Sequence, residues 1–211
     1  MEDVIGYGRW GLVVFYLILV GLFVYGILRP RTRVEWRSMG LAQAFVVALY
    51  AEMYGLPLTL YGVAWLTGQS EYVSDHFHGH AWPYLFGWGD WGAVIFDVVG
   101  QALILVGAGI ALLGWRTLYR HRDGVALGGV YRWVRHPQYL GFVLFLTGSV
   151  VNWPTLPTLL MYPVLVATYY RLARAEEQEM RERASDAYGQ YAASTGFLIP
   201  GLGKAPSDRS I

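Results

Sequence analysis

Long runs of apolar residues without basic side chains constrain this sequence more than any other feature. Three such runs cover residues 10–28, 41–66 and 91–115, and a fourth block extends from Pro137 to about Tyr170. A helix of about 20 apolar residues crosses the roughly 30 Å hydrocarbon layer of a membrane. Backbone polar groups in lipid must be paired internally, so we expect these runs to form helices that span a bilayer.

The last block is too long for one span. It is interrupted by Asn152-Trp153-Pro154-Thr155-Leu156-Pro157, a composition typical of a turn. We therefore predict a helical hairpin that supplies spans four and five. The fold class is then an all-α polytopic membrane protein with five transmembrane helices and a cytoplasmic C-terminal helix. Four spans with a re-entrant hairpin remain an alternative, because that arrangement leaves the charges on the same sides.

Composition agrees with a membrane environment. Hydrophobic residues make up 55% of the chain and charged residues 15%, whereas a soluble domain carries about 25% charged residues. The formal net charge of +1 provides no general attraction to nucleic acid. The chain has no cysteine, which excludes disulfides, thiolate catalysis and cysteine-ligated metals.

Basic residues predict the orientation of the spans. Clusters of arginine follow the first run, the third run and the hairpin, whereas the loop at 68–90 has acidic residues and no Lys or Arg. Only Arg9 falls on the other side. Because basic loops stay in the cytoplasm, we expect the N-terminus outside and the C-terminus in the cytoplasm.

Residues 128–141 form the segment most indicative of a functional site. Proline is favoured in the first turn of a helix, so Pro137 places His136 at the start of span four. Free backbone N–H groups and the charge of Arg135 would make this helix start attractive to anions. Tyr139 lies one turn further along, on the same face as Arg135. A helix start with a positive flank and no ligand is the alternative.

A second polar segment follows the hairpin. Residues 171–180 are rich in helix-forming residues and include Glu176 and Glu177. By itself this pattern is typical of a solvated helix with ion pairs. The hairpin, however, returns the chain to its starting side of the membrane, so we expect both polar segments at the cytoplasmic surface.

Taken together, these segments resemble the integral-membrane methyltransferases, a superfamily that includes isoprenylcysteine carboxyl methyltransferases and phospholipid methyltransferases. The resemblance rests on Gly-Val-Tyr-Arg-Trp-Val-Arg-His-Pro-Gln-Tyr-Leu-Gly at 129–141, on Glu176-Glu177, on Tyr188-Gly189-Gln190-Tyr191 and on Phe197-Leu198-Ile199-Pro200. It covers about the last 75–80 residues. The run Glu52-Met53-Tyr54-Gly55-Leu56-Pro57 is also similar to bacterial relatives of the carboxyl methyltransferases. One departure is Ala187-Tyr188, where many relatives have Phe-Gly before the tyrosine.

The resemblance implies S-adenosylmethionine as the cofactor, bound at the cytoplasmic face, and a lipid or small hydrophobic molecule as the methyl acceptor. It also implies the residues of the cofactor site, which are His136, Tyr139, Glu176 and Glu177, with Gly129, Val130 and Tyr131 along its edge. Catalytic roles fall to Arg135, which would orient the acceptor or balance charge near it, and to Glu177. An amine or thiol acceptor must lose a proton, which Glu177 or His136 could take.

The whole chain, 1–211, is then one membrane methyltransferase-like domain. Residues 1–115 contribute three spans, residues 116–200 the cofactor-binding part with the hairpin, and residues 201–211 a polar tail. The soluble methyltransferases have a glycine-rich element on a parallel sheet, but the glycines at 124, 128 and 129 lack its spacing.

A carboxylate within a membrane span is costly and indicates a functional site by default. Glu52 lies near the middle of the second run, two residues before Tyr54. We expect both residues to line a substrate cavity, although a buried, hydrogen-bonded structural glutamate explains Glu52 equally well.

Two other functions remain open. The C-terminal half is similar in plan to sterol-type membrane reductases, which bind NADPH. His76, His78 and His80 have the spacing of metal ligands in an extended segment, which suggests a metal- or haem-handling protein; we predict no metal site there, because the loop lies on the outer side. The identity of the acceptor and the oligomeric state cannot be read from the sequence.

Overall fold

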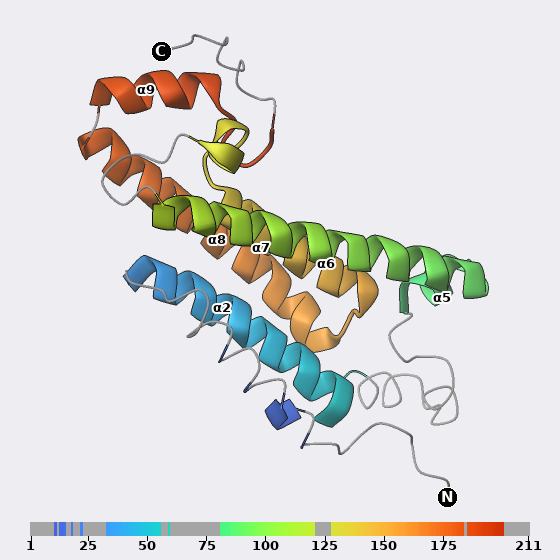
Figure 1. The fold of residues 1–211 in the computed structure, drawn as a ribbon. Helices are drawn as coiled ribbons and strands as arrows, with labels where there is room; N and C mark the ends of the chain where they lie inside the picture. The colour runs from blue at the N-terminus through green and yellow to red at the C-terminus, as the bar shows by residue number, and fades with distance from the viewer. Residues whose placement is uncertain are drawn as a thin grey trace, which may run out of the picture. The chain divides into compact units, whose positions relative to one another are not determined.

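The computed structural model describes residues 11, 13–15, 18, 22, 33–55, 59, 81–120, 128–183 and 185–200. These residues are helical apart from short turns, and no strand occurs among them (Figure 1). The elements are α2 (Arg33–Tyr50), the π-helix η2 (Ala51–Gly55), α5 (Ala81–Phe86), α6 (Gly89–Arg120), the 3-10 helix η3 (Gly129–Arg132), α7 (Pro137–Asn152), α8 (Leu156–Arg183) and α9 (Ser185–Ser194). The all-α prediction is confirmed for this part of the chain.

The chain divides into two compact units. One contains Met1–Ala102 and Leu146–Leu165, and the other contains Leu103–Phe145 and Val166–Ile211. The boundaries fall inside α6, α7 and α8. The organisation of 1–211 as one membrane domain stays a prediction.

Helix α6 contains the third predicted span. Its segment Gly89–Leu118 has 30 residues and a mean hydropathy of 2.1 in its most apolar window, so by length and composition it is able to cross a membrane. Large apolar side chains along it, among them Val98, Leu105 and Val106, are more than half exposed. An apolar surface of this length is unfavourable in water and favourable in lipid.

The number of spans is not confirmed. Among the described residues α6 is the one helix that meets the length and hydropathy of a span, and Met39–Met53 is a shorter apolar stretch. Helix α7 has 16 residues, fewer than the roughly 20 that a perpendicular span needs. Most of the first predicted run and the end of the second lie outside the described residues. Five spans therefore stay a prediction.

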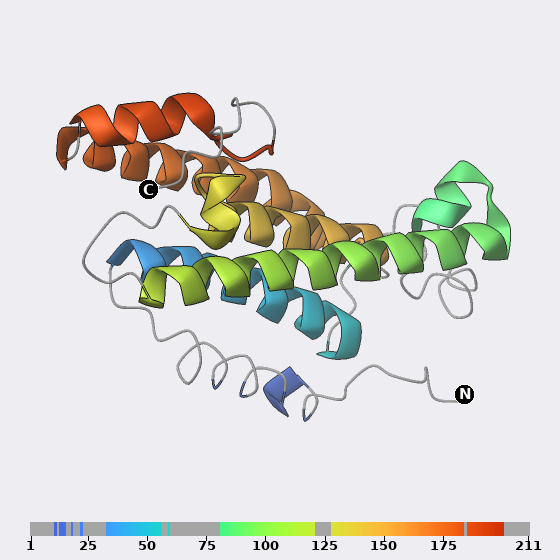
Figure 2. The ribbon, with the colours of Figure 1, turned by 45° about the horizontal axis from the view of Figure 1, so that its top comes forward.

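The predicted hairpin is present as α7, a turn at 153–155 and α8, which run antiparallel beside each other (Figure 2). Thr155 and Thr158 close the turn. The N–H of Thr158 donates to Thr155 Oγ1 at 3.3 Å, and the N–H of Thr155 donates to Thr158 Oγ1 at 3.2 Å. This reciprocal pair satisfies N–H groups at the start of a helix, which is how a capping residue stabilises it.

Small residues let α6 and α7 approach closely. A Cβ atom added at Gly141 would lie 2.6 Å from both Gly107 O and Ala111 N. On α6 this contact involves Gly107 and Ala111, whereas a Cβ atom at Gly109 would meet nothing within 4 Å. One face of α6 therefore packs closely against α7.

Tryptophans divide into exposed and buried ones. Trp88, Trp91 and Trp133 are 55%, 82% and 69% exposed, as expected for side chains at a membrane interface. Trp115, near the other end of α6, is instead buried and meets the ring of Phe142 edge-on. Its indole contributes to helix packing because α7 covers that face of α6.

Candidate functional site

Helix α7 begins at Pro137, as its sequence predicts. His136 directly precedes the helix, and its carbonyl accepts the N–H of Leu140 at 3.1 Å, the first bond of the helix. The imidazole is 6% exposed. The chain therefore fixes His136 at the helix start with its ring inside the protein.

Two polar segments 40 residues apart meet at this point. Arg135 Nε donates to Glu177 Oε1 at 2.5 Å, and Tyr139 Oη donates to Glu176 Oε1 at 2.7 Å. His136 Nδ1 lies 3.5 Å from Glu176 Oε2. The expected convergence of the Arg-His-Pro segment and the paired glutamates is thus present. We call Arg135, His136, Tyr139, Glu176 and Glu177 the polar cluster.

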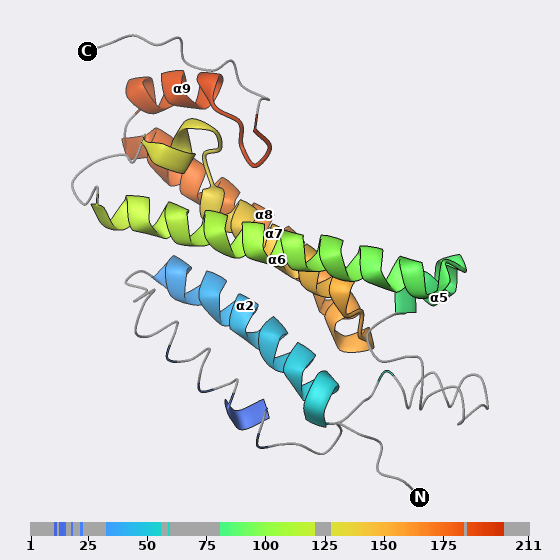
Figure 3. The ribbon, with the colours of Figure 1, turned by 45° about the vertical axis from the view of Figure 1, so that its right-hand side comes forward.

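Arg135 also binds the chain beyond α9. Its Nη1 donates to the carbonyls of Ala192 and Thr195, the latter at 2.6 Å, and its backbone N–H donates to Gly196 O at 2.9 Å. An isolated bridge pairs Val134 with Gly196. Arg135 therefore holds residues 195–197 against the start of α7. Figure 3 shows α9 and this following turn beside η3 and the end of α8.

Two tyrosines of α9 complete the polar surroundings. Tyr188 Oη donates a hydrogen bond to Glu177 Oε1 at 3.5 Å. Burial, and secondly the Glu177 carboxylate, raises the pKa of Tyr188 to about 12. Tyr191 Oη donates to Tyr131 O at 2.7 Å and so fixes η3. Neither tyrosine was predicted to have a role, although their spacing of three residues places them on one helix face.

Phe197 covers the polar cluster on one side. Its ring centroid lies 5.1 Å from that of His136, edge-on. The guanidinium carbons of Arg135 and Arg174 lie 5.6 and 5.5 Å from the centre of the Phe197 ring, within cation–π range. Phe197 belongs to the Phe-Leu-Ile-Pro segment that carried part of the resemblance, but that segment alone does not indicate the contact.

Two buried polar atoms have no hydrogen-bond partner within the described part of the chain. They are His136 Nε2 and Thr195 Oγ1. His136 Nε2 is 3.8 Å from Glu177 Oε1, too far for a hydrogen bond. Burying an unpaired polar group is costly. An unpaired imidazole nitrogen near two carboxylates fits a small ligand rich in hydrogen-bonding groups, which S-adenosylmethionine is.

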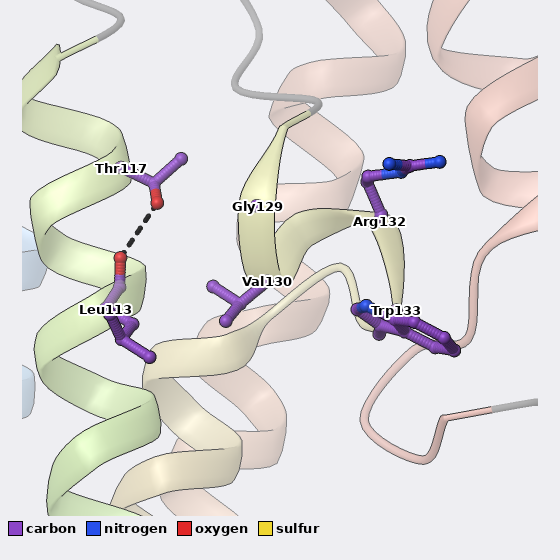
Figure 4. Close-up of a pocket in the computed structure, with 6 residues that line it drawn as sticks. All are labelled: Leu113, Thr117, Gly129, Val130, Arg132 and Trp133. Atoms are coloured by element: carbon purple, nitrogen blue, oxygen red, sulfur yellow. Dashed lines mark hydrogen bonds between the residues drawn. The ribbon is translucent and has the colours of Figure 1, made fainter.

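A hollow of about 430 Å³ lies between α6 and η3. Figure 4 shows Leu113 and Thr117 on α6, with Val130 directed toward them from η3. Gly129, Arg132 and Trp133 complete the lining. Gly129 has φ +62°, and a Cβ atom there would lie 3.3 Å from Thr117 Oγ1. Glycine therefore permits both the turn and the open space.

Glu52 belongs to the other compact unit. It lies in the π-helix η2, is 5% exposed and accepts the backbone N–H of Thr59. This contact gives the carboxylate a structural role in the turn. The side chain of Tyr54 is outside the described residues, so the predicted substrate cavity remains a prediction.

The histidine-rich loop with His76, His78 and His80 also lies outside the described residues. Within the described ranges no group of three or more His, Asp or Glu residues is arranged to hold a metal ion.

The comparison with known families concerns the same part of the chain. A model of the phospholipid methyltransferase family matches residues 96–187, which include most of α6, the Arg-His-Pro segment, the hairpin and both glutamates. The predicted resemblance to the membrane methyltransferase superfamily is confirmed over this segment. The match and the apolar helix α6 together indicate a membrane methyltransferase. No curated protein and no solved structure matches the chain.

Proposed function

We propose that this protein transfers a methyl group from S-adenosylmethionine to a lipophilic or amphiphilic acceptor at the membrane. One observation carries the proposal. The Arg-His-Pro segment and the paired glutamates, which lie within the part of the chain that matches a methyltransferase family, pack against each other and leave a buried imidazole nitrogen unpaired.

In this proposal the cofactor lies against His136, Tyr139 and Glu176. Glu176 is 35% exposed at its side chain, so it is accessible from solvent, and Tyr139 holds one of its oxygens. Gly129, Val130 and Tyr131 form the edge of the site. When bound, S-adenosylmethionine would supply an electrophilic methyl group on a sulfonium sulfur.

The residues of the chain would position the reactants and exclude water. Methyl transfer needs an in-line approach in a desolvated site, which proximity and burial provide. Arg135 and Glu177 act as a charge-balanced pair beside the acceptor. A carboxylate acceptor needs no base, whereas an amine or thiol would lose its proton to Glu177 or His136.

The acceptor would approach from the lipid. The hollow between α6 and η3 is lined by the apolar side chains of Leu113 and Val130, and α6 exposes apolar residues along its length. Arg132 and Trp133 at its rim suit the polar end of an amphiphile. We accordingly propose a multi-pass protein with its N-terminus outside and its C-terminus and the site in the cytoplasm.

Calorimetry of the purified protein with S-adenosylhomocysteine and with NADPH tests this function. We expect saturable binding of the first and none of the second. Glu176→Gln should weaken S-adenosylhomocysteine binding about tenfold, because a charged hydrogen-bonding group at the site is removed. Glu182→Gln is the matched control, since Glu182 lies on the exposed surface of the same helix, and it should bind as the wild type does.

Saturable binding of NADPH without S-adenosylhomocysteine binding would replace the proposal with the reductase alternative. If S-adenosylhomocysteine binds, incubation of the protein with methyl-radiolabelled S-adenosylmethionine and a total membrane-lipid extract would identify the acceptor. Label that partitions into the organic phase supports a lipophilic acceptor.

A further inference from the structure

We infer that the hydroxyl of Thr195 is part of the cofactor site, presented by the turn that follows α9. The inference rests on the proposed function and adds a binding residue to it. Thr195 lies beyond residues 96–187, the segment that matches the methyltransferase family. The family match therefore gives it no role.

The first argument is the burial of an unpaired hydroxyl. Thr195 is 2% exposed, and its Oγ1 has no hydrogen-bond partner among the residues that the structure describes. Leaving a buried hydroxyl unpaired is costly, because the group loses its hydrogen bonds to water and gains none in return. Other buried threonines avoid this cost: Thr158 Oγ1 lies 2.8 Å from Thr155 Oγ1 and donates to Thr155 O at 3.0 Å.

The second argument is that the backbone around Thr195 is held in place from both sides. The N–H of Thr195 donates to Tyr191 O at 3.0 Å, and its carbonyl accepts from Arg135 Nη1. Gly196 cannot be replaced without moving this turn, because a Cβ atom there would lie 2.1 Å from Ile199 O. The hydroxyl is therefore presented from a backbone that is fixed before a ligand binds, which is how a preformed binding site is built.

The third argument is the location of this turn. The same arginine that binds the Thr195 carbonyl binds Glu177, and the ring of Phe197 lies on His136, whose Nε2 is also buried and unpaired. The residues that carry the two unpaired atoms are thus connected through Arg135, Glu177 and Phe197. A single ligand with several hydrogen-bonding groups satisfies both, and S-adenosylmethionine is the ligand already proposed here.

The test compares ligand-free stability with ligand affinity. Thr195→Val keeps the shape of the side chain and removes the hydroxyl. We expect its melting temperature without ligand to be equal to or above that of the wild type, since no internal hydrogen bond is lost. Its affinity for S-adenosylhomocysteine, measured by calorimetry, should fall about tenfold, and Thr195→Ser should retain wild-type affinity.

Thr158→Val is the matched control, because it removes a buried hydroxyl that is paired within the protein. It should lower the melting temperature and leave S-adenosylhomocysteine affinity unchanged. If Thr195→Val lowers the ligand-free melting temperature, the hydroxyl is paired internally or by a bound water, and the inference is overturned. Unchanged affinity in Thr195→Val also overturns it, whereas failure of the wild type to bind S-adenosylhomocysteine would remove the proposed function itself.

Discussion

Glu177 shows how a single side chain organises the polar cluster. Its carboxylate is 2% exposed and accepts from Arg135, with Tyr188 at 3.5 Å. Arg174 and Arg181 lie 3.8 and 4.0 Å from its second oxygen. A buried carboxylate is tolerated only when it is paired and hydrogen-bonded. The Glu177 carboxylate on α8 thus contacts the segment before α7 through Arg135 and contacts α9 through Tyr188. The geometry of the site therefore depends on the folding of α9.

The raised pKa of Tyr188 predicts a loss of stability in alkali. Below pH 10 the phenol is neutral in both folded and unfolded chains. Between pH 10 and about 12 the unfolded chain ionises first, so this contribution to stability falls as pH rises through the folded-state pKa. Tyr188→Phe removes it. The difference in melting temperature between wild type and Tyr188→Phe should therefore change between pH 9.5 and 12 and stay constant below pH 9.

Tyr170→Phe serves as the control for this titration, because the Tyr170 ring is 46% exposed on α8. Its melting temperature should stay close to that of the wild type at neutral pH, because an exposed side chain contributes little to the core. A Tyr188→Phe curve parallel to the wild type up to pH 12 would contradict the prediction.

At the level of the elements, the crossing of α6 and α7 sets the position of the Arg-His-Pro segment. Gly141 lies five residues after His136 and contacts the backbone of α6 at Gly107 and Ala111. Gly114 touches Pro137 in the same way, with an added Cβ 3.2 Å from Pro137 Cγ. The start of α7 is thus held by backbone contact, which small residues permit.

Gly141→Ala should destabilise the protein by about 1–3 kcal/mol, because the added methyl meets backbone atoms that cannot move aside. Gly109→Ala is the matched control on α6. A Cβ atom there meets nothing within 4 Å, so the change should be neutral or stabilise the helix by about 0.5–1 kcal/mol. Thermal unfolding in detergent measures both, and equal melting temperatures for the two variants would contradict the packing.

Local sequence signals predicted the elements better than they predicted the site. Pro137 and the Asn152–Pro157 turn determine where α7 and α8 begin, so both were predictable from residues next to each other. The contacts of Arg135 with Thr195 and of Tyr191 with Tyr131 join residues 60 apart. These contacts form only because α9 packs against η3, and no residue spacing in the sequence predicts that packing. For the same reason the role of Phe197 was not predicted.

The π-helix at 51–55 is a second feature that the sequence did not indicate. The apolar run 41–66 is interrupted by Glu52 and Pro57 in the sequence. That interruption does not indicate that the helix widens at Glu52, where the carboxylate accepts the N–H of Thr59. π-helical turns are rare and occur mostly as single-turn bulges within α-helices. The contact becomes evident only when the chain on both sides of Pro57 is folded.

For the whole molecule, the central prediction is the orientation of the site relative to the membrane. The chain has no cysteine, so single cysteines can be introduced and labelled with a membrane-impermeant maleimide. Ser74→Cys, in the loop without basic residues, should react in intact cells. Ala193→Cys, exposed on α9, should react only after the membrane is opened, because the basic segments around it stay in the cytoplasm.

Labelling of Leu156→Cys distinguishes a topology with five spans from one with four spans and a re-entrant hairpin. Leu156 is 43% exposed at the turn between α7 and α8. If the hairpin crosses the membrane, this cysteine should react from outside like Ser74→Cys, whereas a re-entrant hairpin would keep it unreactive in intact cells. Labelling of Ala193→Cys from outside would contradict the orientation altogether. It would also place the polar cluster away from cytoplasmic S-adenosylmethionine, so the topology and the proposed chemistry depend on the same measurement.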